Sequence, residues 1–171
     1  MESDRFGLAL ATSSAEAAAA YRRGVDLLLA AWPGAEASLL EAIGHDPGFA
    51  LAHAAVARNF QIYGRMPEAR EAIATAAGLA AKATPREAAH VRILELVIAG
   101  QSAKALAALP DHLEAHPRDA LVFSLALGAF AMLLIAAAIE AFWSSVAWFP
   151  DLLKFGSAAL LWLLVLGWLW R

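Results

Sequence analysis

The stretch PGFALAHAAVARNFQIYGRMPEAREAIATAAGLAA, residues 47–81, has the pattern of two helices joined by a short turn at Gly64. Two helices approach to about 8–10 Å only where small side chains lie between them. Ala57 is the small residue expected at this crossing, and Phe60 is the large side chain beside it. The other positions expected to pack inside the unit are His53, Val56, Ala69, Ile73 and Ala76. Such a unit cannot bury its apolar face alone, so we expect it to stack on similar units.

The flanking segments repeat this pattern. Pro47 and Pro117 lie about 70 residues apart, and Gly64 and Gly100 about 36 residues apart, which fits a period of about 34–35 residues. The matching residues in the neighbouring units are Ala35, Leu39, Ala42, Ala105, Leu109, Phe123 and Phe130. The sequence therefore predicts an all-α fold, with a tetratricopeptide-like array of helical hairpins (an α-solenoid) over residues 14–119. The alternative is a plain helical bundle in which the alanines recur by chance.

Capping residues mark where two of the helices begin. Ser13 or Ser14 is a suitable N-cap for the first helix, because a hydroxyl can accept a hydrogen bond from a free backbone N–H. Thr84, followed three residues later by Glu87, has the pattern of a capping box. We expect a helix to begin at each of these points.

A proline predicts an interruption in the last helix of the array. Pro110 has no backbone donor, and its ring disfavours a continuous helix by about 3 kcal/mol. We therefore predict two short helices here, at about residues 102–108 and 110–116.

Charge and hydropathy divide the chain into parts. The 171 residues are 61% hydrophobic, with a mean hydropathy of +0.58, which is high for a soluble domain. Residues 120–171 contain only four charged residues, and five of the six tryptophans lie after residue 142. We therefore divide the chain into an N-terminal tail (1–13), helical repeats (14–119) and a hydrophobic tail (120–171).

The composition argues against several functions. The net charge is −3 and there is no basic run, so the electrostatic footprint of a nucleic-acid-binding protein is missing. Cysteine is absent, which excludes disulfides, thiol catalysis and cysteine-ligated zinc. The acidic first residues are not followed by a long apolar core, so we do not expect a cleaved secretory signal.

Four segments carry a more specific pattern. The segments TPREAAHV (84–91) and HPRDAL (116–121) follow two others, at residues 14–21 and 39–54. Together, over about residues 12–130, they resemble the tetratricopeptide repeat protein 38 family. The resemblance implies an α-solenoid of paired helices with no established catalytic residues. Members of that family are considerably longer, and this chain departs from their pattern after Phe130.

The hydrophobic tail contains two runs that we interpret as membrane helices. Residues 120–139 carry no charged side chain and would span about 30 Å as a helix, the thickness of the apolar core of a bilayer. Residues 154–170 form a second, shorter run. Because tryptophan prefers the membrane interface, the candidate interface anchors are Trp143, Trp148, Trp168 and Trp170.

The charged residues that flank the two runs predict an orientation in the membrane, and two other interpretations of the hydrophobic tail remain open. Arg118 precedes the first run and Arg171 follows the second, so the bias places the repeats on the cytoplasmic side of a membrane. Alternatively, the runs are buried solenoid helices of a soluble cytoplasmic protein. A terminal helix of a soluble array should carry a polar outer face, and residues 160–170 have none, so we favour insertion. A third interpretation is a disrupted reading frame that leaves a truncated family member.

Few side chains have a pattern that predicts chemistry. His112 and His116 are four residues apart, but no third metal ligand is evident, and the order H-x-E-x-H is not that of a metalloprotease. We interpret His90 and Glu87 as capping and surface residues rather than an acid–base pair. The sequence therefore predicts no catalytic, cofactor-binding or metal-binding residues, and a protein that is not an enzyme.

The first helices of the hairpins are expected to line a concave surface for a protein or peptide partner. The candidate contacts are Arg58, Gln61, Ile62, His90 and Leu94, although each could instead be solvated or packed between repeats. We predict a scaffold for protein–protein interaction, with no nucleic acid and no small-molecule substrate, tethered to a lipid bilayer by a C-terminal helical hairpin. The alternative is a soluble structural repeat protein that oligomerises through its tryptophan-rich C-terminal helices.

Overall fold

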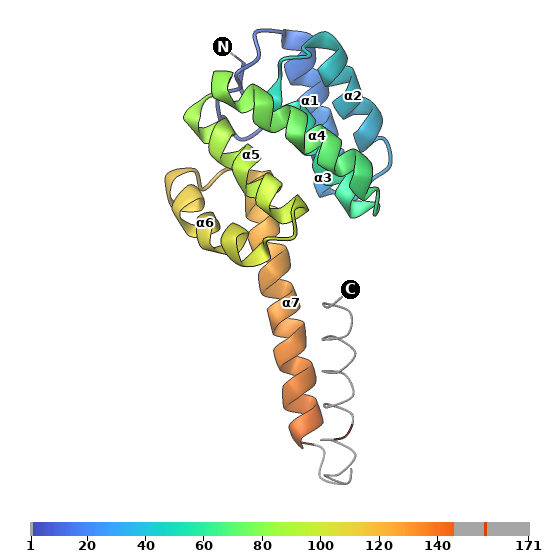
Figure 1. Cartoon of the computed structure of the whole chain (residues 1–171), viewed down its shortest axis with the longest axis vertical. Coiled ribbons are helices and arrows are strands. Elements are labelled where there is room, and N and C mark those ends of the chain that lie inside the picture. The colour runs from blue at the N-terminus through green and yellow to red at the C-terminus, as the bar shows by residue number, and fades with distance from the viewer. Residues whose placement is uncertain (1, 146–155, 157–171) are drawn as a thin grey trace. The chain divides into compact units, whose positions relative to one another are not determined.

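Seven α-helices make up most of the described chain (Figure 1). The computed structural model describes residues 2–145 and residue 156, without the side chains of residues 142–145. The helices are α1 (Ala15–Leu29), α2 (Ala35–His45), α3 (Ala50–Ile62), α4 (Met66–Leu79), α5 (Pro85–Ile98), α6 (Ser102–Ala115) and α7 (Ala120–Ser145), with a 3-10 turn, η1 (Ala80–Lys82), after α4. These residues form no β-strand, and their only β-type pairing is one isolated bridge between Ser3 and Ala9. The all-α prediction is confirmed for this part of the chain.

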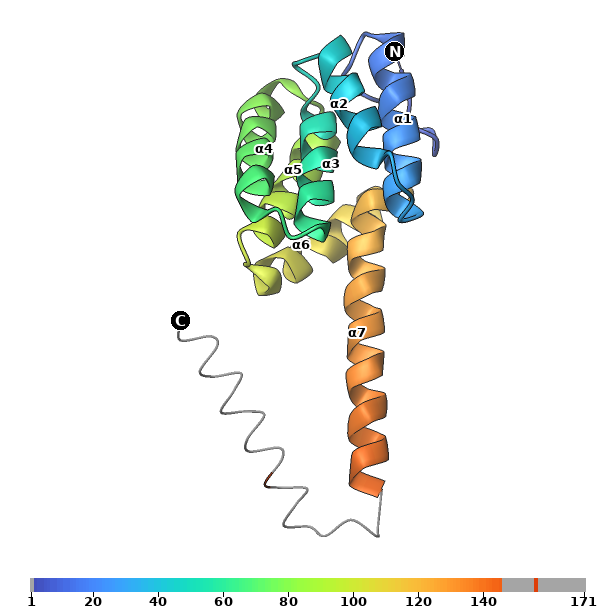
Figure 2. The same ribbon diagram turned by 90° about the vertical axis from the view of Figure 1, so that its right-hand side faces the viewer.

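The chain divides into two units, Met1–Ala126 and Leu127–Arg171, which are described separately. In the first unit, each of helices α1 to α5 packs on the helix that follows it, and α3 also packs on α5. The most extensive contacts are within the pairs α1–α2 and α3–α4. Figure 2 shows α1, α2 and α3 lying side by side. Short turns therefore bring helices that are neighbours in sequence into contact in space.

The predicted helix starts are confirmed. The Ser14 hydroxyl accepts a hydrogen bond from the Ala17 N–H at 3.0 Å, which caps α1. At the start of α5, Thr84 Oγ1 accepts from the Glu87 N–H at 3.2 Å, and Glu87 Oε2 accepts from the Thr84 N–H at 3.0 Å. These reciprocal bonds form the capping box expected from the sequence.

Small residues allow the helices of the first unit to approach closely. A Cβ atom at Gly24 of α1 would lie 2.7 Å from Cγ of Leu39 in α2, and Leu39 itself is fully buried. The residues predicted to pack inside the α3–α4 unit are buried, namely Val56, Ala57, Phe60, Ala69, Ile73 and Ala76. His53 is only half-buried, and its Nε2 atom lies 3.0 Å from the Pro47 carbonyl oxygen.

The predicted turns at Gly64 and Gly100 are confirmed. Gly64 joins α3 to α4 with a φ of +74°, and Gly100 joins α5 to α6 with a φ of +72°. Both values lie in the left-handed region, where a residue with a Cβ atom is strained and glycine is not.

The predicted break at Pro110 is wrong, because α6 continues through it from Ser102 to Ala115. Proline removes the hydrogen bond that residue 110 would donate to the carbonyl of Leu106. Both Leu106 and Pro110 lie on the exposed side of α6, where water can bond to that carbonyl. The missing hydrogen bond therefore does not end the helix.

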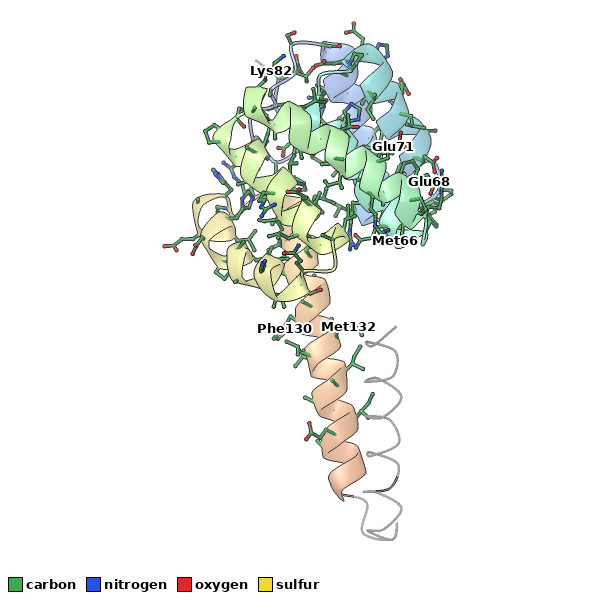
Figure 3. The ribbon with its side chains drawn as sticks, in the orientation of Figure 1. Met66, Glu68, Glu71, Lys82, Phe130 and Met132 are labelled. Carbon is green, nitrogen blue, oxygen red and sulfur yellow. The ribbon has the colours of Figure 1, made fainter. Side chains whose placement is uncertain are left out.

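In the second unit, the structure describes residues 127–145 of α7 and residue 156. The large apolar side chains of this helix are exposed on all sides, including Leu127, Phe130, Met132, Leu133, Leu134, Ile135 and Ile139. Figure 3 shows Phe130 and Met132 projecting from different sides of the helix. The predicted helix at 154–170 lies outside the described residues, except for residue 156.

Candidate functional site

Three of the five predicted partner contacts lie together at the C-terminal end of α3. Arg58 Nη1 donates a hydrogen bond to Gln61 Oε1 at 2.7 Å, and both side chains are half-buried. Partial burial lowers the pKa of Arg58, but its guanidinium remains charged at neutral pH. Ile62, the next residue along, is exposed. These three residues offer a small surface with one positive charge and one apolar side chain.

The other two predicted contacts do not belong to this surface. His90 and Leu94 of α5 are 1% and 0% exposed, so neither side chain can touch a partner, which corrects the expectation for both. Glu87 caps its helix as expected, but it is also fully buried, so the interpretation of His90 and Glu87 as surface residues is wrong. The reason is that α5 packs on α3, α4 and α6, which leaves little of it in contact with solvent.

Asp119 is the centre of a buried polar cluster, which consists of Arg86, His90, His112 and Asp119. Its Oδ2 atom lies 3.2 Å from Arg86 Nη1, 3.0 Å from His90 Nδ1 and 3.1 Å from His112 Nε2. An ionised carboxylate only accepts hydrogen bonds, so each of these nitrogens donates to it. Arg86 belongs to the segment TPREAAHV and Asp119 to the segment HPRDAL. The two most specific segments of the sequence therefore meet at one carboxylate.

The charge of Asp119 is stabilised by its neighbours. Burial acts to raise the pKa of Asp119, but the charges and hydrogen bonds of His90, His112 and Arg86 outweigh burial and lower its pKa well below the usual range. The carboxylate is therefore ionised at neutral pH. Nearby, burial raises the pKa of Tyr21, and the negative charge of Asp119 raises it further. Because all four members of the cluster are buried, the cluster holds helices together and does not present a reactive group at the surface.

The N-terminal segment is attached to the same part of α5. Arg86 Nη2 donates a hydrogen bond to the Ala9 carbonyl oxygen at 2.8 Å, and the Ala11 N–H donates to Glu87 Oε1 at 2.9 Å. Leu10, between them, is buried in the hydrophobic core. Arg86 and Glu87, at the start of α5, thus both bind the N-terminal segment, and Arg86 also binds Asp119.

The two histidines considered as metal ligands have different surroundings. His112 is buried in α6 and donates to Asp119, while His116 is half-buried at the end of α6. Burial lowers the pKa of His116, and the neighbouring His112 lowers it further. Their ring centroids lie 5.2 Å apart. Among the described residues, no group of three or more histidine, aspartate or glutamate side chains is arranged to hold a metal ion.

Helix α7 is the other feature that bears on function. Residues 120–141 of α7 form a stretch of 22 residues that is long and apolar enough to cross a membrane, and its most apolar 18-residue window has a mean hydropathy of 2.5. It is the one such helix among the described residues. Of the predicted interface anchors, Trp143 lies in α7, but its side chain is outside the description. Trp148, Trp168 and Trp170 lie outside the described residues altogether.

Sequence reasoning missed the Asp119 cluster. One signal could have found part of it: Arg86 and His90 are four residues apart on a helix, so they share a face with Leu94. A polar residue on an apolar face needs a buried partner. Asp119, however, lies 29 residues beyond His90 in sequence, and no periodic pattern connects them.

Comparison with known proteins gives no further guide. No family model matches the chain, and no curated protein or solved structure matches it. The inferences about function therefore depend on the sequence and on the geometry of the chain itself.

Proposed function

We propose that this chain is a non-catalytic helical-repeat scaffold for protein–protein interaction, tethered to a membrane by its C-terminal hydrophobic segment. The observation that carries the proposal is the exposed apolar surface of α7. Its most apolar window is only 6% buried, whereas a helix that is apolar on all sides is normally covered by protein or by lipid. Within the described residues no protein covers this surface, so lipid is the solvent that suits it.

The length of the helix supports the same conclusion. At about 1.5 Å per residue, 22 residues extend for about 33 Å, which matches the apolar core of a bilayer at about 30 Å. Glu140 is the single charged residue between Ala120 and Ala141 and lies near one end, where a carboxylate can reach the headgroup region. Arg118, just before the span, favours a cytoplasmic location for the preceding helices.

The packing of α1–α6 supports the scaffold part of the proposal. Successive helices contact one another, and α3 also contacts α5, the first helix of the next pair. This is the arrangement expected of a tetratricopeptide-like α-solenoid and of a member of the tetratricopeptide repeat protein 38 family. Arrays of this kind bind proteins or peptides on the surfaces of stacked helices. On this chain, Arg58, Gln61 and Ile62 are the residues proposed for that role.

Extraction of membranes with alkaline carbonate tests the tether. We expect the full chain to stay in the membrane pellet. Replacing Leu133 and Leu134 with arginine should release it, because each arginine near the centre of a span disfavours insertion by about 2.5–3.5 kcal/mol. The matched control carries Leu40→Arg and Leu106→Arg, the same changes at exposed positions of α2 and α6, and should stay in the pellet.

Release of the unmodified chain into the supernatant would contradict membrane insertion. If the released chain also ran as an oligomer in gel filtration without detergent, the soluble alternative, assembly through the tryptophan-rich end, would replace the proposal. Orientation is tested on sealed vesicles that expose their cytoplasmic face. Protease added outside should digest α1–α6, and survival of these helices would contradict a cytoplasmic location.

A further inference from the structure

A pocket of about 400 Å³ lies at the turn ends of the first two helix pairs. One wall is the start of α2, from Pro33 to Glu36, and the other is the end of α3, with Asn59 and Tyr63. Arg65, in the turn after α3, completes it. The pocket lies within the first unit and is separate from the Asp119 cluster.

The first residues of α2 belong to the lining of this pocket. Gly34 is the N-cap residue, and no side chain caps the helix. The first N–H groups of an α-helix have no partner within the helix, and the helix dipole makes this end partly positive. An acceptor, preferably an anion, is therefore favoured at this end of α2.

A second donor in the pocket is independent of the helix end. The Asn59 side chain is 1% exposed, and its Nδ2 amide has no hydrogen-bond partner among the described residues. A buried donor without a partner destabilises a protein by about 1–3 kcal/mol, so such groups are rare and call for an explanation. A ligand that supplies an acceptor oxygen would satisfy it.

The one carboxylate in the pocket lining, that of Glu36, is already paired. Both carboxylate oxygens of Glu36 accept from Arg65 Nη1, at 3.0 and 2.9 Å. Arg65 Nε also donates to Glu68 at 3.0 Å. The donors that remain for a ligand include the amide of Asn59 and the N–H groups at the start of α2.

From these contacts we propose that the pocket binds an oxyanion, the carboxylate or phosphate group of a ligand. One oxygen accepts from the N–H groups at the start of α2, and another accepts from Asn59 Nδ2. The Nδ2 atom itself is buried, so the ligand reaches it only when neighbouring side chains move aside.

Nuclear magnetic resonance on the isotopically labelled full chain in detergent micelles tests the site. The signals observed are the backbone amides of Ala35 and Glu36 and the side-chain amide of Asn59. The probes are sodium acetate and inorganic phosphate at constant ionic strength, with methylammonium chloride as the cationic control. We expect saturable shifts of all three signals, together with those of Tyr63, for at least one anion and none for methylammonium. The anion that binds more tightly distinguishes a carboxylate ligand from a phosphate ligand.

Three variants make the test specific. Asn59→Asp replaces the donor with a carboxylate and should weaken anion binding at least about ten-fold. Gln101→Glu adds the same charge at an exposed position before α6, outside the pocket lining, and should change binding less than about two-fold. Glu36→Gln removes the negative charge from the pocket and should strengthen binding about three-fold or more. Its side chain is partly exposed, so the fold should be retained.

Several results would overturn the proposal. These are the absence of saturable shifts with either anion, equal binding by methylammonium, and weakening of binding by Glu36→Gln. The proposal would also be overturned if Asn59→Asp bound the anion as tightly as the unmodified chain does. The measurement reads the pocket directly, so its outcome is independent of whether α7 spans a membrane or whether the chain is a scaffold.

Discussion

Helices α1–α6 and the described part of α7 after Ala126 are built from similar apolar residues but present them differently. In α1–α6, alanines such as Ala57 and Ala69 are buried between helices, and polar residues cover the outside. In α7, the larger Leu133 and Ile135 are exposed. A helix with one apolar stripe packs on protein, whereas one that is apolar on all sides needs a second apolar solvent. The distribution of apolar residues around the helix, more than their number, therefore indicates the environment.

The two regions also differ in how they hold charge. The first unit keeps Arg86, Glu87 and Asp119 in its interior, each bonded to a partner. Between residues 127 and 145, the sequence contains one charged residue, Glu140. The stability of the first unit should therefore be sensitive to single polar changes, and the proposed membrane association of α7 should not be affected by them.

The largest expected effect comes from Asp119→Ala. This change removes the acceptor that Arg86, His90 and His112 share, and leaves Arg86 with Glu87, 3.8 Å away, as its remaining carboxylate partner. Breaking a buried pair by removing one member destabilises a protein by about 3–5 kcal/mol. Urea unfolding of the full chain in detergent, followed by circular dichroism, should show that loss. Carbonate extraction should still leave the variant in the membrane pellet.

Asp111→Ala is the matched control for this change. Asp111 is exposed on α6, so its removal should change the free energy of unfolding by less than about 0.5 kcal/mol. If Asp119→Ala changed the free energy of unfolding as little as Asp111→Ala, the polar cluster would not stabilise the first unit.

The next largest effect is a dependence of the free energy of unfolding on pH, which we attribute to Asp119. The folded-state pKa of Asp119 is lowered, so its contribution to stability is fully present above its unfolded pKa of about 3.9 and is lost as the pH falls toward the folded value. Urea unfolding should therefore show a free energy of unfolding that declines below about pH 4. In Asp119→Asn the decline should be shallower, because one titrating group is absent. An identical decline in both proteins would show that Asp119 does not contribute to acid sensitivity.

Local signals allowed much of the fold to be predicted from the sequence. Ser14, Thr84 and Gly64 act within a few residues of their own positions, through a cap, a capping box and a left-handed turn. The same reasoning failed at Pro110, because continuation of α6 depends on solvent reaching the Leu106 carbonyl. Access of solvent to that carbonyl depends on which side of α6 faces outward, and the local sequence around Pro110 does not specify this.

The candidate sites were less predictable because they depend on which way each helix faces. His90 and Leu94 were placed on a surface, yet α5 packs on three other helices. Asn59 is one of four polar residues in the alanine-rich α3, and only the fold shows that its amide is buried and has no hydrogen-bond partner among the described residues. Buried polar contacts between distant segments leave no periodic trace in a sequence.

The smallest expected changes come from replacing three glycines, which have different surroundings, with alanine. A Cβ at Gly24 would lie 2.7 Å from Leu39 Cγ, whereas no atom of the described residues lies within 4 Å of one at Gly78 of α4 or at Gly128 of α7. Gly24→Ala should destabilise the first unit by about 1–2 kcal/mol. Overpacking the contact with Leu39 costs about 1–3 kcal/mol, which exceeds the gain of about 1 kcal/mol in helix propensity from glycine to alanine. Gly78→Ala should instead stabilise it by about 0.5–1 kcal/mol. Urea unfolding measures both changes.

Gly128→Ala should leave carbonate extraction unchanged, because a methyl group added to an exposed apolar surface is compatible with lipid. The opposite signs at Gly24 and Gly78 are the critical result, since both residues lie in helices and differ mainly in what surrounds them. If Gly24→Ala stabilised the chain as Gly78→Ala does, α1 and α2 would not be in close contact at this point. Small residues would then not explain how the first unit packs, and the contrast with α7 would rest on the exposure of its side chains alone.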